Sequence, residues 1–389
     1  MISCSFLYKK FEREKEFKVK FNIDRTLFIS KLEKAANIIN PKHSIPIMQG
    51  VLLEVRPEGM LLTGTNGTET ISIYTQFNGD IGECEVAGKA VFAPGPILKI
   101  IKKYRGPVLT IEVNKENEQL VFKENEKKSF SFLTLEVEEF PNLTFEQGKV
   151  LGHLPSGALS TIGEQTLHAV SASETRPVLT GVNFIVTNDK LTCIATDSFR
   201  LSKSTYPVTN SSIKEEAKFV VPAPSLKNAI RICEDQDTVK LMATETQLIV
   251  RGGSVVYQTR LLEGAYPDTN RLIPSSYDSK VSILKEDLLN TIEQIQFISE
   301  TVLMESKDLF FSCTPGKKEV GNAQIDLTAD MEGDINVMCN ARYLIDAIKT
   351  VHSPEIVIDF TLRNNAPGPF VLKGSNEDDK LQLILPVRM

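Results

Sequence analysis

The sequence predicts an α+β protein that consists of three similar domains. At 389 residues the chain is too long for one ordinary hydrophobic core. Apolar residues alternate with a period of two in some stretches and recur at helical spacing in others, so both strands and helices are expected. The same patterns recur later in the chain at a constant offset, which indicates that one α+β unit is repeated.

The first unit begins with strand and helix signals in direct succession. Residues 17–21 alternate between apolar and polar, and apolar residues at helical spacing follow over 27–39 until Asn40-Pro41 ends the predicted helix. Residues 45–55 are predicted to form a turn that leads into a strand. Residues 61–74 are predicted to form two strands joined by a turn at Thr65-Asn66-Gly67.

Two features of this first unit recur in a single register. Pro46 matches Pro177, at an offset of 177 − 46 = 131 positions, and each is followed by aliphatic residues and a glycine. The Thr65-Asn66 turn matches Thr196-Asp197, at an offset of 196 − 65 = 131 positions. Two matches at one offset make coincidence a weak explanation, so we expect the second unit to repeat the first.

Further elements extend the repeat and add a third unit. Residues 92–101 resemble 221–230, each as a strand end that turns into a short helix, and 140–142 resemble 266–268. The third unit starts near Lys280 with a strand at 281–283, continues with helices over 288–298 and around 343–348, and finishes with an apolar stretch at 381–387. Units of about 110 to 130 residues have a common domain size. The predicted domains are 17–146, 147–275 and 276–389, after an N-terminal extension of residues 1–16.

Composition and charge narrow the classes of function. The chain is 41% hydrophobic and 24% charged, as is usual for a soluble globular protein, and its six cysteines form no C-x-x-C pair. No signal-peptide core and no run of roughly 18 apolar residues are present, so a cytoplasmic protein without a membrane span is expected. The net charge of −6 argues against adhesion of the whole surface to DNA, although a basic inner face on an acidic body would give the same total.

Signals for catalysis are missing from the sequence. The four histidines, His43, His153, His168 and His352, lie far apart, and no two share helical spacing. The chain has no phosphate-binding loop, no dinucleotide-binding glycine pattern, no nucleophile elbow and no zinc-protease motif. We therefore expect no catalytic residues, no metal and no cofactor, and a hydrolase or transferase would require a polar cluster that the sequence does not show.

Basic residues recur on the predicted helices of successive units. Lys31 and Lys34 lie on the first helix, and Lys102, Lys103 and Arg105 follow the second. Lys227, Arg231 and Lys349 occupy the corresponding helices of the later units. A solvated helix face explains each group taken singly, whereas repetition across units favours a shared basic surface.

Two apolar segments have patterns typical of a surface that binds a partner. Residues 191–201 end a strand in a Thr-Asp-Ser turn that is followed by Phe199, Arg200 and Leu201. The chain finishes with an aliphatic run from Leu383 to Val387, then Arg388 and Met389. A final edge strand explains that run, but it could also form the wall of a pocket for a short linear peptide.

Taken together, these motifs resemble those of the bacterial DNA polymerase III beta subunit family, the DNA sliding clamps. The resemblance runs over 17–389 and is carried by 45–50, 176–181, 196–201, 140–142, 266–268 and 385–388. It implies two head-to-tail protomers with six similar domains, antiparallel sheets outside and helices lining a central hole. Such a ring encircles double-stranded DNA of any sequence, tethers a polymerase without catalysing a reaction, and is opened by an ATP-driven loader.

The resemblance also implies a partner-peptide pocket between the second and third domains. Aliphatic side chains would hold apolar residues of the partner's linear motif, while Arg200 and Arg388 would orient polar groups at the rim. The family usually has Gly-His where this chain has Ser198-Phe199. The positions that match the pocket are Leu179, Thr196, Ser198, Phe199, Arg200, Leu201, Pro267, Arg271, Leu272, Leu383, Leu385, Pro386, Val387, Arg388 and Met389.

DNA and dimer contacts follow from the same resemblance. The residues expected to face DNA are Lys31, Lys34, Lys42, Lys102, Lys103, Arg105, Arg176, Lys227, Arg231 and Lys349. Ring closure is expected to pair Phe130 and Phe132 of one protomer with Phe297 and Ile298 of its partner. The predicted function is a homodimeric sliding clamp, of the main or an accessory kind. The alternative is a clamp-like module that binds peptides and no longer encircles DNA.

Overall fold

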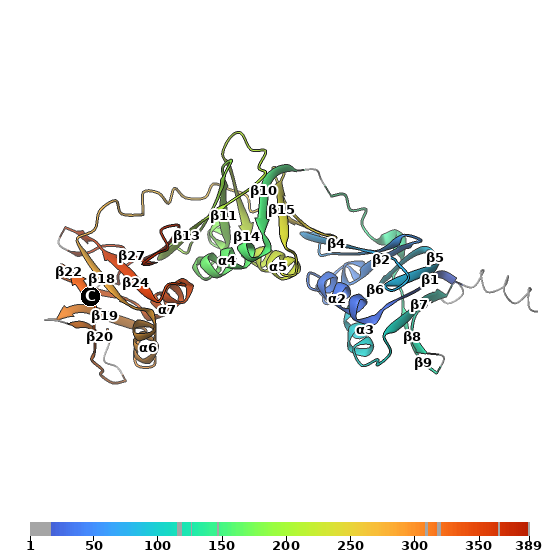
Figure 1. Cartoon of the computed structure of the whole chain (residues 1–389), viewed down its shortest axis with the longest axis horizontal. Helices are drawn as coiled ribbons and strands as arrows, with labels where there is room; N and C mark the ends of the chain where they lie inside the picture. Colours follow the sequence, from blue (N-terminus) through green and yellow to red (C-terminus); the bar gives the residue numbers. More distant parts are fainter. Residues whose placement is uncertain are drawn as a thin grey trace, which may run out of the picture. The chain divides into compact units, whose positions relative to one another are not determined.

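The computed structural model describes residues 17–114, 119–125, 127–145, 148–307, 310–316, 320–364 and 366–387. The predicted extension 1–16 and the predicted pocket residues Arg388 and Met389 lie outside these ranges. Within them, antiparallel sheets carry short helices, so the predicted α+β class is confirmed (Figure 1). The chain divides into two compact units, Met1–Ser156 with Lys227–Arg260 and Gly157–Leu226 with Leu261–Met389.

The first unit contains a five-stranded sheet in the order β5-β1-β7-β8-β9. Its strands are β1 (Phe17–Asp24), β5 (Gly82–Val86), β7 (Val108–Asn114), β8 (Gln119–Asn125) and β9 (Lys128–Leu133). Among the described residues, strand β9 pairs with β8 at the end of the strand order, so it forms one edge of this sheet. An edge strand presents free backbone groups to a partner strand.

A second sheet of the first unit joins strands from distant parts of the sequence, in the order β10-β15-β16-β17-β4-β3-β2-β6. Strand β4 pairs directly with β17, with Ile71 opposite Tyr257, so strands of the first and second predicted domains share one sheet. The strands are β2 (Val51–Arg56), β3 (Gly59–Thr65), β4 (Glu69–Gln76), β6 (Gly88–Phe92), β10 (Lys149–Pro155), β15 (Thr238–Ala243), β16 (Gln247–Gly252) and β17 (Val255–Arg260).

Helices α2 (Arg25–Ala36) and α3 (Pro94–Ile101) pack together in the first unit. The carboxylate of Asp24 caps α2 by accepting a hydrogen bond from the backbone N–H of Leu27 at 2.7 Å. Phe28 of α2 is fully buried and its ring lies 6.0 Å from that of Phe122. The helix ends at Ala36, three residues before the predicted end. Two short 3-10 turns, η1 (Pro46–Gln49) and η2 (Val137–Glu139), also lie in this unit.

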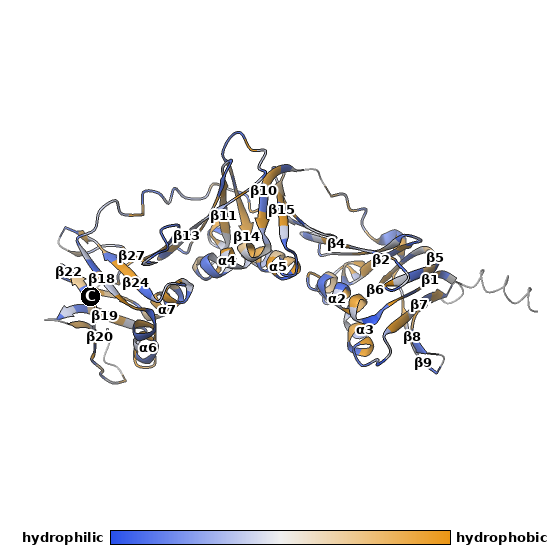
Figure 2. Cartoon of the chain, in the orientation of Figure 1, coloured by the Kyte–Doolittle hydropathy of each residue, from blue (hydrophilic) through white to orange (hydrophobic). Residues whose placement is uncertain are grey.

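The second unit contains a nine-stranded sheet in the order β14-β11-β12-β13-β28-β27-β24-β18-β22. Strand β13 pairs with β28, with Leu201 opposite Leu383, so this sheet too joins two predicted domains. Its strands are β11 (Gly181–Val186), β12 (Lys190–Thr196), β13 (Arg200–Pro207), β14 (Ala217–Pro222), β18 (Ser279–Leu284), β22 (Asp330–Glu332), β24 (Glu355–Phe360), β27 (Phe370–Gly374) and β28 (Lys380–Ile384). Figure 2 shows strongly hydrophobic colouring along β24 and β27.

A smaller sheet and two helices form the rest of the third predicted domain. The sheet runs β21-β20-β19-β23, from β19 (Thr301–Lys307), β20 (Phe310–Pro315), β21 (Ile325–Leu327) and β23 (Asn336–Asn340). Helices α6 (Lys285–Gln296) and α7 (Ala341–Thr350) pack against each other, and Ile292, Leu344 and Phe311 lie in their shared core. Strands β25 (Leu362–Arg363) and β26 (Ala366–Pro367) form a separate two-stranded sheet.

The remaining helical elements come from the second repeat. They are α4 (Ser156–Thr166), η3 (Leu167–Ala169), η4 (Pro177–Thr180) and α5 (Ala223–Cys233), and the unit boundaries cut through α4 and α5. Each of the described helices is too short or too polar to cross a lipid bilayer.

Candidate functional site

The turn between β12 and β13 is held by its own side chains. The hydroxyl of Thr196 donates to the carbonyl oxygen of Arg200 at 2.6 Å. One carboxylate oxygen of Asp197 accepts the backbone N–H groups of Phe199 and Arg200, each at 2.9 Å. Ser198 between them has a φ of +79°, a left-handed conformation that side-chain-bearing residues rarely adopt. The turn is therefore a fixed platform for Phe199.

The corresponding turn of the first repeat has the same geometry. Asn66 accepts the backbone N–H groups of Thr68 and Glu69 at 3.0 and 2.8 Å, as Asp197 does for its own successors. Gly67 has a φ of +84° and stands at 198 − 131 = 67, the position that matches Ser198. The turn thus belongs to the repeated fold, whereas the residues on it differ between the copies.

The left-handed Ser198 gives a stability prediction. A left-handed residue with a Cβ costs about 1–2 kcal/mol, while glycine loses about 0.4–1 kcal/mol more backbone entropy on folding. Replacing Ser198 with Gly should therefore raise the free energy of unfolding by roughly 0.5 kcal/mol in urea denaturation. The matched change Ser276→Gly, at an exposed position without positive φ, should lower it. A lower value for Ser198→Gly than for Ser276→Gly would contradict this reasoning.

Four large apolar side chains on this part of the second unit face solvent. Phe199 is 61% exposed, Leu272 45%, Leu385 37% and Val387 40%. The backbone N–H of Leu385 donates to the carbonyl oxygen of Phe199 at 2.9 Å, which fixes the C-terminal segment beside the turn. We call these four residues the apolar surface. Exposed apolar side chains held by a rigid backbone are typical of a protein interaction site.

Other predicted pocket residues are buried and pack in the core next to this surface. Leu201 and Leu383 are buried in one small core with Ile194, and Ile273 packs against that core next to Leu272. The hydroxyl of Tyr266 accepts the backbone N–H of Thr196 at 3.0 Å. Leu179 and Thr196 are also buried. These residues shape the site, but their side chains are not available to a partner in this structure.

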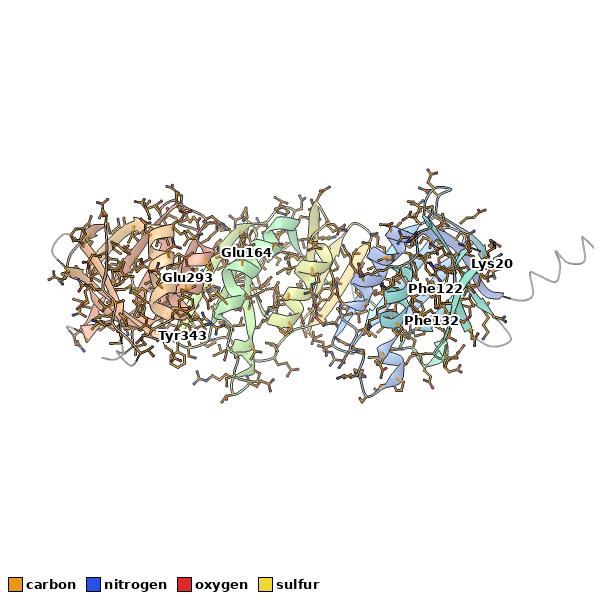
Figure 3. All side chains as sticks on the ribbon, turned by 90° about the horizontal axis from the view of Figure 1, so that it is seen from below. Lys20, Phe122, Phe132, Glu164, Glu293 and Tyr343 are labelled. Atoms are coloured by element: carbon orange, nitrogen blue, oxygen red, sulfur yellow. The ribbon has the colours of Figure 1, made fainter. Side chains whose placement is uncertain are left out.

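Arg200 differs from its predicted role at the rim. Its side chain is only 12% exposed, and its Nε lies 2.9 Å from a carboxylate oxygen of Asp197. Its Nη1 lies 2.7 Å from a carboxylate oxygen of Asp346, and its guanidinium carbon lies 4.3 Å from the centre of the Tyr343 ring. The guanidinium is thus engaged within the protein. Tyr343, which is labelled in Figure 3, and Asp346 both come from α7.

The sequence reasoning did not identify Tyr343 and Asp346 as part of the site. Both are half-buried, and Tyr343 also packs against the core of the third domain. The available signal was that Asp346 interrupts an otherwise apolar helical stretch. Spacing alone does not say which strand such residues meet.

A network of buried polar side chains surrounds Gln382 of β28. His168 Nε2 is 3.2 Å from the side-chain oxygen of Gln382, whose amide nitrogen donates to the Ser202 hydroxyl at 3.0 Å. The side-chain amide of Gln165 donates to the backbone oxygen of Thr350 at 2.6 Å. Burial lowers the pKa of His168, and the neighbouring Arg200 charge lowers it further. The lowered pKa favours the neutral form of this buried imidazole.

The remaining residues that were predicted to lie at the rim of the pocket differ in their exposure to solvent. Arg271 extends into solvent with its side chain 88% exposed, 3.3 Å from the carboxylate of Asp268. Pro267 is exposed and Pro386 is half-buried. Arg388 and Met389 lie outside the described residues.

Nearly all of the residues expected to face DNA are accessible. Lys31 is half-buried, and Lys42, Lys102, Lys103, Arg105, Arg176, Lys227, Arg231 and Lys349 are exposed. Lys102 and Lys349 form surface ion pairs with Glu33 and Glu293.

Lys34 is the exception among these basic residues, and its predicted role is wrong in this structure. It is 8% exposed, and its ammonium group lies 2.5 Å from the carboxylate of Asp235 and 3.1 Å from the backbone oxygen of Ile232. A buried ammonium needs such partners to offset its lost hydration. Lys34 therefore links α2 to the end of α5 and is not available to DNA.

The residues predicted for the dimer interface lie on two separate surfaces. Phe130, on the edge strand β9, is 42% exposed, while Phe132 packs edge-on against Phe122 at 6.0 Å. Phe122 and Phe132 are both labelled in Figure 3. In the other unit Phe297 follows α6 and is 88% exposed, and Ile298 is half-buried. Each unit thus presents an exposed phenylalanine where the prediction placed the interface.

Metal-binding chemistry has no candidate in the part of the chain that the structure describes. No group of three or more histidine, cysteine, aspartate and glutamate residues is arranged there to hold an ion. The cysteines Cys193, Cys313 and Cys339 are buried, and burial raises the pKa of each thiol. Thiols in this protonated state are structural and unreactive.

Comparison with known proteins identifies the family. The sequence matches the family models for the DNA polymerase III beta subunit over all three domains, N-terminal at 19–144, central at 153–268 and C-terminal at 270–388. The beta sliding clamp of Bacillus subtilis is 30% identical over 384 residues, which cover 95% of this chain and 100% of that relative. The beta sliding clamp of Staphylococcus epidermidis is 29% identical over 383 residues, 95% of this chain and 99% of the relative.

The fold agrees with this match. The crystal structure of the DNA polymerase sliding clamp from Bacillus subtilis superposes with a TM-score of 0.89 at 28% identity, and it covers 96% of this chain and 100% of its own. The predicted architecture of three repeated clamp domains is therefore confirmed. The chain belongs to the DNA polymerase III beta subunit family, the beta sliding clamps, and is a non-catalytic processivity clamp.

Proposed function

We propose that two copies of this chain close into a ring around double-stranded DNA and that the ring tethers a DNA polymerase through the apolar surface. The observation that carries the proposal is the set of four exposed apolar residues, Phe199, Leu272, Leu385 and Val387, beside a turn with a fixed backbone. The matches to sliding clamps over 95% of the chain support the same function. A separate ATP-driven loader opens the ring, and the protein works in the bacterial cytoplasm.

Encirclement accounts for the charge of the protein. A net charge of −6 gives no general attraction to DNA, so tight binding by phosphate pairing is not the mode we propose. A closed ring needs only weak, non-specific contacts, because its topology prevents dissociation. The exposed basic residues, among them Lys103, Arg105, Lys227 and Arg231, suit such sliding contacts.

Ring closure in this proposal uses the two separate surfaces of each chain. The edge strand β9 with Phe130 meets the Phe297 surface of the partner subunit, so that the exposed rings become buried. The proposed domains are 17–146, 147–275 and 276–389. A head-to-tail dimer of three such domains has six domains around the hole.

The proposal predicts topological retention on DNA. The chain, loaded onto nicked circular DNA, should co-elute with it in gel filtration and be lost after the DNA is linearised. A tenfold difference in retained protein between the two forms is the expected scale, since sliding off the ends is fast relative to elution. Light scattering on the free protein should give a mass of 2 × 43.3 = 86.6 kDa.

Two results would count against the ring. Equal retention on circular and linear DNA would mean ordinary surface adhesion. A monomeric mass at micromolar concentration, together with peptide binding, would favour the alternative of an interaction module that does not encircle DNA.

A further inference from the structure

The second unit contains a cleft beside the segment that leads from the second predicted domain to the third. The cleft is lined by strands β11 and β14 and by residues 264–270, and its volume is about 400 Å³. Ligand pockets commonly have volumes of this order. We call it the linker cleft. None of the four residues of the apolar surface lines it, so the two are separate sites.

Two polar residues that line the linker cleft are buried without a partner for their side chains. Asn183 is 6% exposed and Thr269 is 4% exposed. Within the described ranges, no hydrogen bond joins either side chain to the rest of the protein. Buried polar groups without a hydrogen bond are costly, and native proteins contain few of them. A carboxamide and a hydroxyl in this state suit a ligand that brings its own donor and acceptor groups.

The first repeat carries leucine at both of these positions. Leu52 stands at 183 − 131 = 52, and Leu143 stands at 269 − 126 = 143, where 126 is the offset between 140–142 and 266–268. Both leucines line the corresponding cleft of the first unit, whose volume is about 350 Å³. The repeated fold therefore does not require polar side chains at these two positions. Their presence in the second repeat indicates a role in binding.

The backbone beside the cleft is suited to a strand-like ligand. Strand β14 lies at one end of the nine-stranded sheet. The backbone oxygen of Val220 on β14 accepts the N–H of Leu262 at 2.9 Å, in an isolated bridge at the start of the linker segment. Because backbone groups alternate in an antiparallel pair, the N–H and C=O of Lys218 point to the same side as those of Val220. In the part of the chain that the structure describes, this side of Lys218 is open to a further extended segment.

We propose that the linker cleft is a second binding site, which takes an uncharged, extended peptide segment of a partner protein. Backbone N–H and C=O groups of the segment pair with the carboxamide of Asn183 and the hydroxyl of Thr269, and small apolar side chains contact Ile185. This site goes beyond the proposed ring and its apolar surface, since it shares none of the four residues of that surface.

The charges around the cleft favour an uncharged ligand. Lys218 and Asp268 both line the cleft, and they carry opposite charges. Each is exposed and already has a partner on the surface, Glu216 at 2.5 Å from Lys218 and Arg271 at 3.3 Å from Asp268. Exposed pairs of this kind contribute little to binding or stability. Recognition therefore depends on the neutral hydrogen-bonding groups inside the cleft.

The test compares two short peptides on the full-length protein. The first is alanyl-glycyl-alanine with an acetylated amino end and an N-methylamide at the other end. The second carries a methyl group on every backbone nitrogen, so it keeps the carbonyl groups but has no N–H donor. With the isoleucine methyl groups labelled with carbon-13, the first peptide should shift the NMR signal of Ile185 saturably by about 10 mM and leave that of Ile292, in the core of the third domain, unchanged. The methylated peptide should bind about tenfold more weakly.

Two variants connect this effect to the carboxamide. Asn183→Leu places the residue type of Leu52 in the second repeat, so the variant should stay folded. It should bind the unmethylated peptide about tenfold more weakly and no longer distinguish the two peptides. Asn188→Leu changes an exposed position outside the cleft and should leave both affinities unchanged. A merely structural role of Asn183 would not make binding depend on the N–H groups of the peptide.

Three outcomes would overturn the inference. The first is the absence of a saturable shift of the Ile185 signal in the wild-type protein, because the cleft would then take no peptide. The second is equal affinity for the two peptides, which would mean that the cleft holds an apolar ligand without using its polar groups. The third is an Asn183→Leu variant that still prefers the unmethylated peptide. If Asn183→Leu does not fold, the comparison of the two peptides on the wild-type protein decides the question.

Discussion

Phe199→Asp should abolish binding of a polymerase-derived peptide to the folded protein. Phe199 is the most exposed of the four residues of the apolar surface, and its backbone is fixed on both sides by hydrogen bonds to Asp197 and Leu385. An aromatic residue that a partner buries commonly contributes 2 kcal/mol or more, and each 1.4 kcal/mol is a factor of ten in affinity. A charge at this position adds a desolvation cost. We expect affinity to fall by about 30-fold or more in a calorimetric titration.

A matched substitution distinguishes a local effect from general damage. Leu362, in the same unit, is 51% exposed and lies outside the apolar surface, so Leu362→Asp should leave peptide affinity unchanged. Both variants should melt within a few degrees of the wild-type protein, because neither position is buried. Loss of affinity in both, or in neither, would contradict the assignment of the surface to the partner.

The repeated turn is an element whose position in both copies could be predicted from the sequence. The offset of 131 positions placed Thr65-Asn66-Gly67 opposite Thr196-Asp197-Ser198, and the structure gives both turns the same capping hydrogen bonds and the same positive φ. Such local geometry follows from turn chemistry, in which a side-chain oxygen accepts nearby backbone N–H groups. The difference between Gly67 and Ser198 was also visible in the sequence, although its strain was not.

Contacts between elements that lie far apart in the sequence could not be predicted from the sequence. The pattern on the first helix predicted a charged face, but Lys34 meets Asp235, 235 − 34 = 201 positions away, and is buried. Arg200 was expected to orient polar groups of a partner at the rim, yet it binds Asp346 on α7. Periodicity gives the face of an element and not its partner, so it does not reveal when a charged side chain is neutralised within the fold.

The pairing of strands into sheets likewise could not be predicted from the sequence. Strands at 17–21 and 61–74 were predicted from alternation, but the pairing of β4 with β17 and of β13 with β28 joins segments from different repeats. Such pairing depends on long-range geometry that local patterns do not encode. As a result, two of the predicted domain boundaries separate segments that share a sheet, and the boundaries stay a prediction.

Glu69→Ala should cause the largest loss of stability among the changes considered. Glu69 is 7% exposed, and its carboxylate accepts hydrogen bonds from the Tyr257 hydroxyl and from the side-chain amides of Asn66 and Asn228. Removal of the acceptor from a buried group of three donors should lower the free energy of unfolding by about 3 kcal/mol. Urea denaturation followed by circular dichroism measures the loss.

The repeat makes this result informative about the junction between the first two domains. Glu69 lies on β4, Asn228 on α5 and Tyr257 on β17, so the carboxylate joins two repeats within one unit. Glu69→Gln keeps one acceptor oxygen and should lose about half as much. The surface change Glu85→Ala, which removes an exposed ion pair with Lys20, should stay within about 0.5 kcal/mol. If Glu69→Ala cost no more than Glu85→Ala, the buried carboxylate would not stabilise the junction.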